Sequence, residues 1–205
     1  MAHERLTLRR ARHDDLTDLV KLEAACWPTP LAAQHDQLSA RIATFHRGQL
    51  VAQIGEQLVG YSSAQRIHAE LITNDPLQYN TVTDNDRFTT THANDGEIYQ
   101  LVGVSTAPEF RGRRIARQLI DLQIARAWKL DGVRRVMGFT RPAARHLTPE
   151  LSLESYVAIQ LTARGSDKTL AFHLNAGARI VSCHDNFRPS DQQSLVGGVL
   201  IEYSR

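Results

Sequence analysis

The order of apolar and polar positions along the chain predicts alternating strands and helices. Residues 6–9 alternate apolar and polar side chains, as a half-buried strand does. Apolar side chains then recur at helical spacing after Asp14 and Asp15, one of which we expect to cap that helix. A second helical pattern spans roughly residues 32–45 and stops at Gly48. The chain is therefore predicted to begin with a strand and two helices.

The same reading of periodicity extends to the C-terminus. The further predicted strands, the first two forming a hairpin, are residues 50–54, 58–64, 97–104, 133–139, 179–181 and 198–202. The further predicted helices are residues 115–130, 153–161 and a short helix that Asp167 caps and Gly177 closes. Strands and helices alternate along one chain, which predicts a mixed α/β fold.

Two segments interrupt the pattern. Residues 73–95 are rich in Asn, Asp and Thr and predict a long polar loop, either a lid over an active site or a solvated insertion. Residues 140–166 form an insertion before the last helix. With 205 residues in total, we expect one domain over residues 1–205.

Composition excludes several classes of protein. A hydrophobic content of 42% and a charged content of 22% are ordinary for a globular protein, and a net charge of +2 favours neither nucleic acid nor a membrane as a partner. No apolar run is long enough to span a membrane, and the N-terminus lacks the apolar core of a signal peptide. Cys26 and Cys183 form neither a disulfide framework nor a metal cluster. We therefore predict a cytoplasmic protein without a metal.

A run with three arginines between the strand at 97–104 and the helix at 115–130 is the main candidate ligand-binding segment. It consists of Arg111, Gly112, Arg113, Arg114, Ile115 and Ala116. A turn from a strand into a helix leaves unpaired N–H groups and the positive end of the helix dipole facing the turn, which favours a phosphate or pyrophosphate ligand. The alternative is a solvated helix start or a patch for nucleic acid. The spacing matches neither the P-loop nor the dinucleotide fingerprint.

Residues 107–116 resemble the pyrophosphate loop of the GNAT acyltransferase superfamily, Gln/Arg-x-x-Gly-x-Gly/Ala. The resemblance implies the GNAT fold, whose mostly antiparallel sheet is splayed between strands four and five. It also implies that loop N–H groups bind the pyrophosphate of a coenzyme A thioester. Arg114 stands where the family usually has its first loop glycine. We expect Arg114 to adopt helical backbone angles and its charge to contact a second phosphate.

The same resemblance assigns further contacts. Val102 and Val104, on the strand before the loop, and Asn175, on the last helix, are expected to contact the cofactor. In the family, that last helix usually carries a Tyr that protonates the leaving thiolate, and the matching position here is His173. A histidine can donate a hydrogen bond or a proton near neutral pH. The alternative is a histidine without a role.

Three more positions accompany His173. They are Thr140 directly after a strand, Arg188 in a C-terminal loop and Trp27 at the end of the first helix. Taken singly, each has a structural explanation. Together, the Phe-Thr-Arg, Phe-His-x-x-x-Gly-Ala and Arg-Pro sequences resemble the GNAT-like loading domains of modular polyketide synthases, of the curacin type.

That subgroup implies a reaction. Thr140 and His173 would be the catalytic pair, with Trp27 and Arg188 binding the acyl group. The implied activity is decarboxylation of malonyl-CoA or methylmalonyl-CoA, with transfer of the acyl starter to an acyl carrier protein thiol as a further step.

Two other functions stay open. An N-acetyltransferase would move acetyl from acetyl-CoA to an amine, and Glu97 is the best candidate base for that reaction. A non-catalytic acyl-CoA-binding module would use the loop alone.

Overall fold

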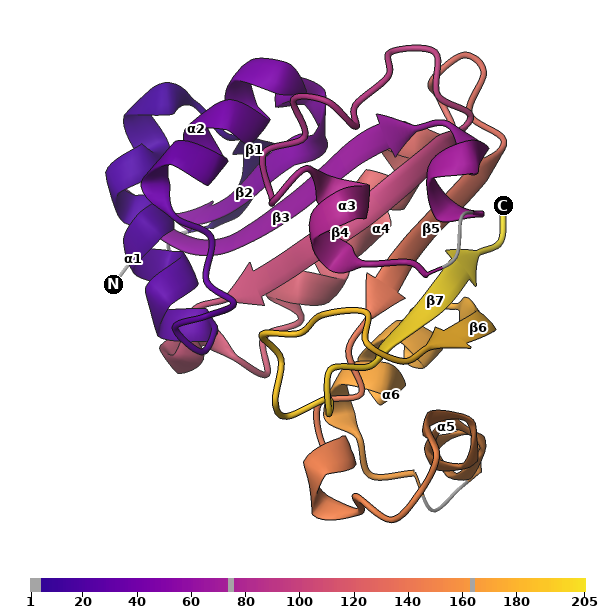
Figure 1. The fold of residues 1–205 in the computed structure, drawn as a ribbon. Coiled ribbons are helices and arrows are strands. Elements are labelled where there is room, and N and C mark those ends of the chain that lie inside the picture. Colours follow the sequence, from indigo (N-terminus) through magenta and orange to yellow (C-terminus); the bar gives the residue numbers. More distant parts are fainter. Residues whose placement is uncertain (1–4, 74–75, 163–164) are drawn as a thin grey trace.

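A seven-stranded sheet forms the centre of the molecule, and the computed structural model describes residues 5–73, 76–162 and 165–205 (Figure 1). The strands are β1 (Leu6–Arg10), β2 (Gln49–Ile54), β3 (Gln57–Ile67), β4 (Ile98–Thr106), β5 (Arg135–Thr140), β6 (Ala178–His184) and β7 (Gly198–Tyr203). Their order in the sheet is β1-β2-β3-β4-β5-β7-β6. Neighbours are antiparallel except β4 and β5, which are parallel. The predicted mixed α/β fold is confirmed.

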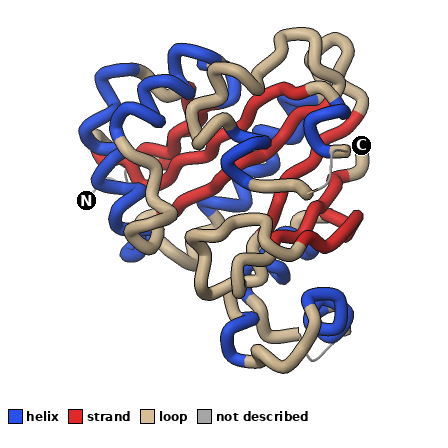
Figure 2. The backbone as a smooth tube through the Cα atoms, in the orientation of Figure 1, coloured by secondary structure: helices blue, strands red, loops and turns tan. Residues whose placement is uncertain are grey.

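Helices cover both faces of the sheet, as the tube in Figure 2 also shows. They are α1 (Leu16–Cys26), α2 (His35–Thr44), α3 (Tyr79–Thr83), α4 (Ile115–Ala127), α5 (Leu153–Gln160) and α6 (Lys168–Asn175). Apolar side chains of α1, α2 and α3 pack on one face, and those of α4, α5 and α6 pack on the other. Over the described residues, none of these helices has the length and apolar character that crossing a bilayer requires.

The helix caps were predicted with mixed success. Asp167 caps α6 as expected, because its carboxylate accepts hydrogen bonds from the N–H groups of Thr169 and Leu170. Gly177 follows α6 with a φ of +91°. Asp15 precedes α1, but its carboxylate accepts no hydrogen bond from the first turn of that helix. Its carboxylate instead binds the guanidinium of Arg9 on β1 at 2.7 Å and accepts a hydrogen bond from the N–H of Arg12 at 2.7 Å.

Other helix and strand boundaries differ from those that the periodicity predicts. The second helix begins at His35, after a turn at residues 29–31 and a short extended stretch, and β3 continues to Ile67. Within the predicted polar loop at 73–95, the structure has the short helix α3, and Val82 and Phe88 are fully buried. Part of this segment is therefore packed into the fold and is not merely solvated, and a lid over an active site stays a prediction. The helix predicted at 153–161 is confirmed as α5.

The parallel pair β4–β5 opens part-way along its length. Pairing runs from Ile98 opposite Arg135 to Leu101 opposite Gly138 and then stops. At the same level, β4 has a bulge, because Ser63 of β3 pairs with Gly103 while its neighbour Ala64 pairs with Leu101. A bulge bends the strand that carries it, so β4 turns away from β5.

Gly138 occupies the last paired position. A Cβ atom there would lie 2.8 Å from the carbonyl oxygen of Leu101, which is closer than a real Cβ approaches backbone. We predict that Gly138→Ala lowers the free energy of unfolding by about 1–3 kcal/mol, because the two strands would have to move apart. Urea denaturation at neutral pH measures this difference.

The matched control is Gly103→Ala on β4, where a Cβ would meet nothing within 4 Å. That variant should unfold within about 0.5 kcal/mol of the wild type. Equal losses in both variants would mean that strand glycines, and not the contact with Leu101, set the effect.

Candidate active site

A cavity of about 650 Å³ begins where β4 and β5 separate. The second half of β4, the end of β5, the start of α4 and one side of α6 form its walls. Of the residues that the sequence singled out, those lining the cavity are Trp27, Val102, Val104, Arg111, Gly112, Arg114, Ile115, Ala116, Thr140, His173 and Arg188. Residues far apart along the chain are thus gathered in one place.

The loop before α4 has the geometry of an anion site. Gly112 has a φ of +82°, and the N–H groups of residues 112–116 have no hydrogen-bond acceptor within the described ranges. These N–H groups and the N-terminus of α4 carry partial positive charge. Arg111 and Arg114 add two formal charges at the cavity wall. The loop can therefore hold a pyrophosphate.

Arg114 departs from the expected backbone. Its φ of 59° and ψ of 22° place it in the left-handed region, not in the right-handed helical conformation that we expected. A residue with a Cβ pays about 1 kcal/mol to adopt that conformation, which explains why a glycine suits this position. The loop keeps its shape here at the expense of local strain.

Two predicted cofactor contacts lie elsewhere. The guanidinium carbon of Arg113 lies 4.9 Å from the centre of the Phe110 ring, and Arg113 does not line the cavity. Asn175 ends α6 outside the cavity, where its carbonyl oxygen accepts a hydrogen bond from Arg117 at 2.8 Å. Any role for these two residues in binding the cofactor stays a prediction.

His173 lies half-buried on α6 and contacts Tyr203 of β7. Its Nδ1 atom is 2.6 Å from the Tyr203 hydroxyl oxygen. Burial lowers the pKa of His173 to about 4 and raises the pKa of Tyr203, so both groups are neutral at pH 7. When the Tyr203 O–H donates to Nδ1, the imidazole proton resides on Nε2. His173 can then donate a hydrogen bond into the cavity.

Thr140 ends β5 with its side chain almost fully buried, at 2% exposure. Its Oγ1 atom has no hydrogen-bond partner among the described residues. Leaving a buried hydroxyl unpaired is unfavourable, so such groups usually have a bound partner. A ligand oxygen in the cavity would supply that partner.

Trp27 is fixed from behind by a chain of hydrogen bonds. Its indole N–H donates to Ser105 Oγ at 2.7 Å, and the Ser105 hydroxyl donates to Glu23 at 2.6 Å. Burial raises the pKa of Glu23, although Ser105 partly opposes that effect. The indole is therefore held in one orientation at the cavity wall.

The sequence reasoning missed an ion pair beside Trp27. Arg141 binds Asp191 through two hydrogen bonds of 2.7 and 2.5 Å, and both residues line the cavity. Burial alone would raise the pKa of Asp191, but Arg141 lowers it below its usual range. Arg141 directly follows Thr140, so the strand end already pointed to it. Its partner lies 50 residues on, and no local signal predicts the pair.

Tyr203 was also missed, although the alternation along β7 indicated its direction. Val199, Ile201 and Tyr203 share one face of that strand and pack in the cluster that includes α6. An aromatic hydroxyl on this face was the signal that could have identified Tyr203.

Glu97, the candidate base, lies before β4 and does not line the cavity. It accepts a hydrogen bond from the N–H of Ala69 at 2.9 Å.

A family model supports the assignment that the loop suggested. The model of the acetyltransferase (GNAT) family matches residues 16–148. The chain belongs to the GNAT family. The matched range includes β4, the loop and α4.

Relatives of this GNAT protein include an N-acetyltransferase and GNAT-like proteins of known structure. An uncharacterized N-acetyltransferase of Bacillus subtilis (strain 168), YkwB, is 28% identical over 98% of this chain and 89% of its own length. The loading GNATL domain of CurA from Lyngbya majuscula has a TM-score of 0.83 at 24% identity, with 98% of each chain covered. The GphF GNAT-like decarboxylase in complex with isobutyryl-CoA has a TM-score of 0.84 at 30% identity, covering 97% of this chain and 98% of GphF.

Substituting Arg114 by glycine has two effects that can be measured separately: it relieves the backbone strain and it removes the charge. We predict that Arg114→Gly keeps the free energy of unfolding or raises it by up to about 1 kcal/mol, because glycine adopts this φ without a steric penalty. Affinity for coenzyme A should fall severalfold, since one charge at the cavity wall is lost. Urea denaturation and calorimetric titration measure the two effects. Unchanged or tighter binding of coenzyme A by Arg114→Gly would contradict the proposed phosphate contact.

The lowered pKa of His173 makes stability depend on pH. An unfolded histidine binds a proton near pH 6.5, whereas folded His173 does so only near pH 4, so stability is lost as pH falls between these values. From pH 7.5 to pH 5 we expect the wild type to lose about 2 kcal/mol more than His173→Gln. Urea denaturation at both pH values measures the difference. Parallel losses in the two proteins would show that His173 is not protected from protonation.

Proposed function

We propose that the chain is a GNAT-fold decarboxylase of malonyl-CoA or methylmalonyl-CoA that provides an acyl starter for polyketide synthesis. The observation that carries this proposal is the Thr140 hydroxyl, which is buried, unpaired among the described residues and in one cavity with a neutral histidine. Two neutral donors facing one cavity suit an oxygen that gains negative charge during reaction.

Decarboxylation needs such donors. The bond between the carboxylate and the α-carbon breaks, its electron pair moves into the thioester as an enolate, and carbon dioxide leaves. A proton from water then converts the enolate to the acetyl group. In this proposal Thr140 and Nε2 of His173 donate hydrogen bonds to the thioester oxygen as its charge develops. No strong base takes part.

The remaining cavity residues fit the substrate. The loop from Arg111 to Ala116 would bind the pyrophosphate of the coenzyme A thioester. Arg188 would hold the free carboxylate of the acyl group, and the indole of Trp27 would exclude water from that carboxylate. The likeness to the GphF decarboxylase, at 30% identity over nearly the whole chain, supports this assignment.

The cavity offers few groups that could act as a general base, which suits a decarboxylase. Asp191 is the one acidic residue that lines the cavity in the described part of the chain, and Arg141 occupies its carboxylate. An N-acetyltransferase needs a group that deprotonates an ammonium. The likeness to YkwB favours that reaction as a second candidate, with acetyl-CoA as the donor and an amine as the acceptor. A non-catalytic acyl-CoA-binding module would bind either thioester and convert neither.

The test is to incubate the protein with malonyl-CoA and no acceptor and to follow acetyl-CoA by mass spectrometry. We predict that Thr140→Val and His173→Ala each lower the decarboxylation rate by about 100-fold or more, because each removes one preorganised donor. Thr140→Ser, which keeps the hydroxyl, is the control and should stay active. Coenzyme A should bind all variants with similar affinity.

Other results would assign another function. Acetylation of an amine library without decarboxylation would replace the proposal by N-acetyl transfer. Binding of malonyl-CoA without any turnover would indicate the binding module. Transfer of the acyl group to an acyl carrier protein is tested separately, by adding the carrier and measuring its mass.

A further inference from the structure

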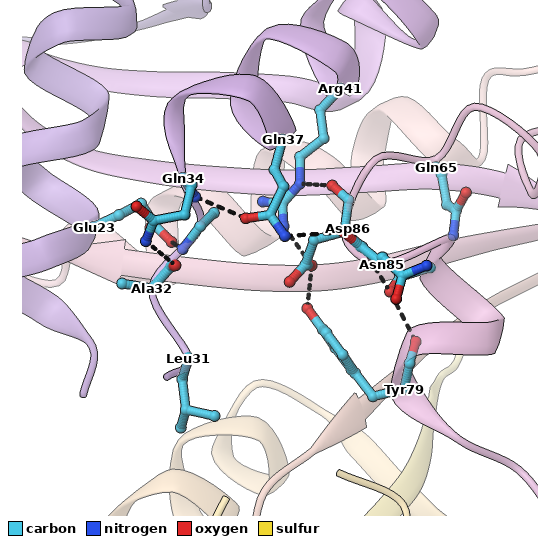
Figure 3. Close-up of polar contacts among 12 residues, drawn as sticks. Glu23, Leu31, Ala32, Gln34, Gln37, Arg41, Gln65, Tyr79, Asn85 and Asp86 are labelled. Carbon is cyan, nitrogen blue, oxygen red and sulfur yellow. Dashed lines mark hydrogen bonds and ion pairs between the residues drawn. The ribbon is translucent and has the colours of Figure 1, made fainter. Parts of the chain in front are cut away.

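A buried polar cluster lies behind the cavity wall, where the segment between β3 and β4 contacts α2. Asp86 is its centre, with 6% of its surface exposed. The Asp86 carboxylate accepts hydrogen bonds from the Arg41 guanidinium on α2 and from the Tyr79 hydroxyl on α3 (Figure 3). Arg41 Nε also donates to the Asp86 carbonyl oxygen at 2.7 Å. Arg41 and Tyr79 are themselves buried, so the cluster is shielded from water.

The backbone that presents Asp86 is strained. Asp84, Asn85 and Asp86 have φ values of 49°, 51° and 69°, three successive left-handed residues without a glycine. Each costs of order 1 kcal/mol or more and persists only where surrounding contacts hold it. Gln37 of α2 provides one such contact by donating to the Asn85 carbonyl oxygen at 2.9 Å (Figure 3). Strain maintained at a buried carboxylate indicates that the carboxylate's position matters.

The cluster reaches the cavity through Tyr79 and Arg188. The guanidinium carbon of Arg188 lies 3.8 Å from the centre of the Tyr79 ring, and both residues line the cavity. Arg188 NH2 is 3.8 Å from Asp86 and 3.3 Å from the carbonyl oxygen of Leu31. A packing contact between Tyr79 and Phe187 and a hydrogen bond from Tyr79 N–H to the Phe187 carbonyl oxygen, 2.7 Å long, fix the two segments together.

Arg188 keeps unused donors in this arrangement. Its Nε and NH1 groups have no acceptor within the described ranges. Its ion pair with Asp86 Oδ2 is long, at 3.8 Å, and Asp86 Oδ1 accepts the hydrogen bonds from Arg41 and Tyr79. A guanidinium that is only 15% exposed, with open donors and a counterion at 3.8 Å that makes no hydrogen bond to it, favours an anion at the cavity wall.

We propose that Tyr79 and Asp86 are a positioning pair that holds Arg188 against the cavity, so that the acyl site selects thioesters whose acyl group ends in a carboxylate. This inference rests on the proposed function, because it deepens the role of Arg188 in it. The Tyr79 ring supports the flat face of the guanidinium, and Asp86 fixes the ring through its hydroxyl. Arg41 neutralises the charge that Asp86 would otherwise bury alone.

The experiment compares two substitutions at Tyr79 in steady-state decarboxylation. Tyr79→Leu removes the ring and should raise KM for malonyl-CoA about 30-fold, the loss expected for a desolvated cation–π contact. Tyr79→Phe keeps the ring but not the hydroxyl and should raise KM about fivefold. In both, kcat should change much less than KM. Acetyl-CoA, tested as a competitive inhibitor, should keep its inhibition constant because it carries no carboxylate.

Tyr99→Phe is the matched control. It also removes a buried tyrosine hydroxyl, which donates to Gln123 at 2.5 Å, but Tyr99 does not line the cavity. Its KM should equal that of the wild type. An equal change in the malonyl-CoA and acetyl-CoA constants at Tyr79 would show a merely structural role and overturn the inference. If Tyr79→Leu does not fold, Tyr79→Phe decides alone, and an unchanged KM there overturns it too.

Failure of the proposed function gives a different result. A wild type that does not decarboxylate malonyl-CoA removes that function, and calorimetry then tests the positioning pair directly. Binding of malonyl-CoA in preference to acetyl-CoA, with the preference lost in Tyr79→Leu, would still support the pair. Equal binding of the two thioesters by the wild type would overturn it.

Discussion

The separation of β4 from β5 is the constraint on which the rest of the structure depends. Two parallel strands that stop pairing leave backbone groups and side chains without neighbours, and something must fill that space. In this chain the pairing ends at Leu101 and Gly138, and the bulge on β4 directs the strand away. The cavity, the unpaired Thr140 hydroxyl and the anion loop after β4 all follow from this one opening.

Apart from Thr140, the polar side chains described above that line the cavity beyond the anion loop each have a partner behind them. Tyr203 contacts His173, Ser105 and Glu23 hold Trp27, Asp191 binds Arg141, and Tyr79 with Asp86 supports Arg188. Buried polar groups without partners would destabilise the fold, and mobile ones would bind a ligand poorly. The same contacts therefore serve stability and preorganise the site.

The elements were predictable where a local pattern determines them. Alternation and helical spacing placed the sheet strands, and the Asp167 cap was predictable because its partners lie two and three residues away. Asp15 shows the limit, since its carboxylate binds Arg9 of a neighbouring strand instead of its own helix. The helix α3 was missed because Tyr79 and Val82 are buried by contacts with segments distant in sequence.

The candidate site also has a part that the sequence predicts and a part that only the structure reveals. The basic loop and the two candidate catalytic residues were found from motifs, and the structure brings them to one cavity. The left-handed φ of Arg114 could not be expected, because the loop's tertiary geometry overrides that residue's own preference. Tyr203, Asp191 and Asp86 act through partners far along the chain, so only the fold reveals them.

The most direct test of the central claim is the decarboxylation of malonyl-CoA in deuterated water without an acceptor. If Thr140 and His173 stabilise a thioester enolate, the acetyl-CoA product should carry deuterium on its methyl group, because the enolate takes its proton from the solvent. Carbon dioxide should form in equal amount. Malonyl-CoA that remains intact, while acetyl-CoA acetylates an added amine, would contradict the account.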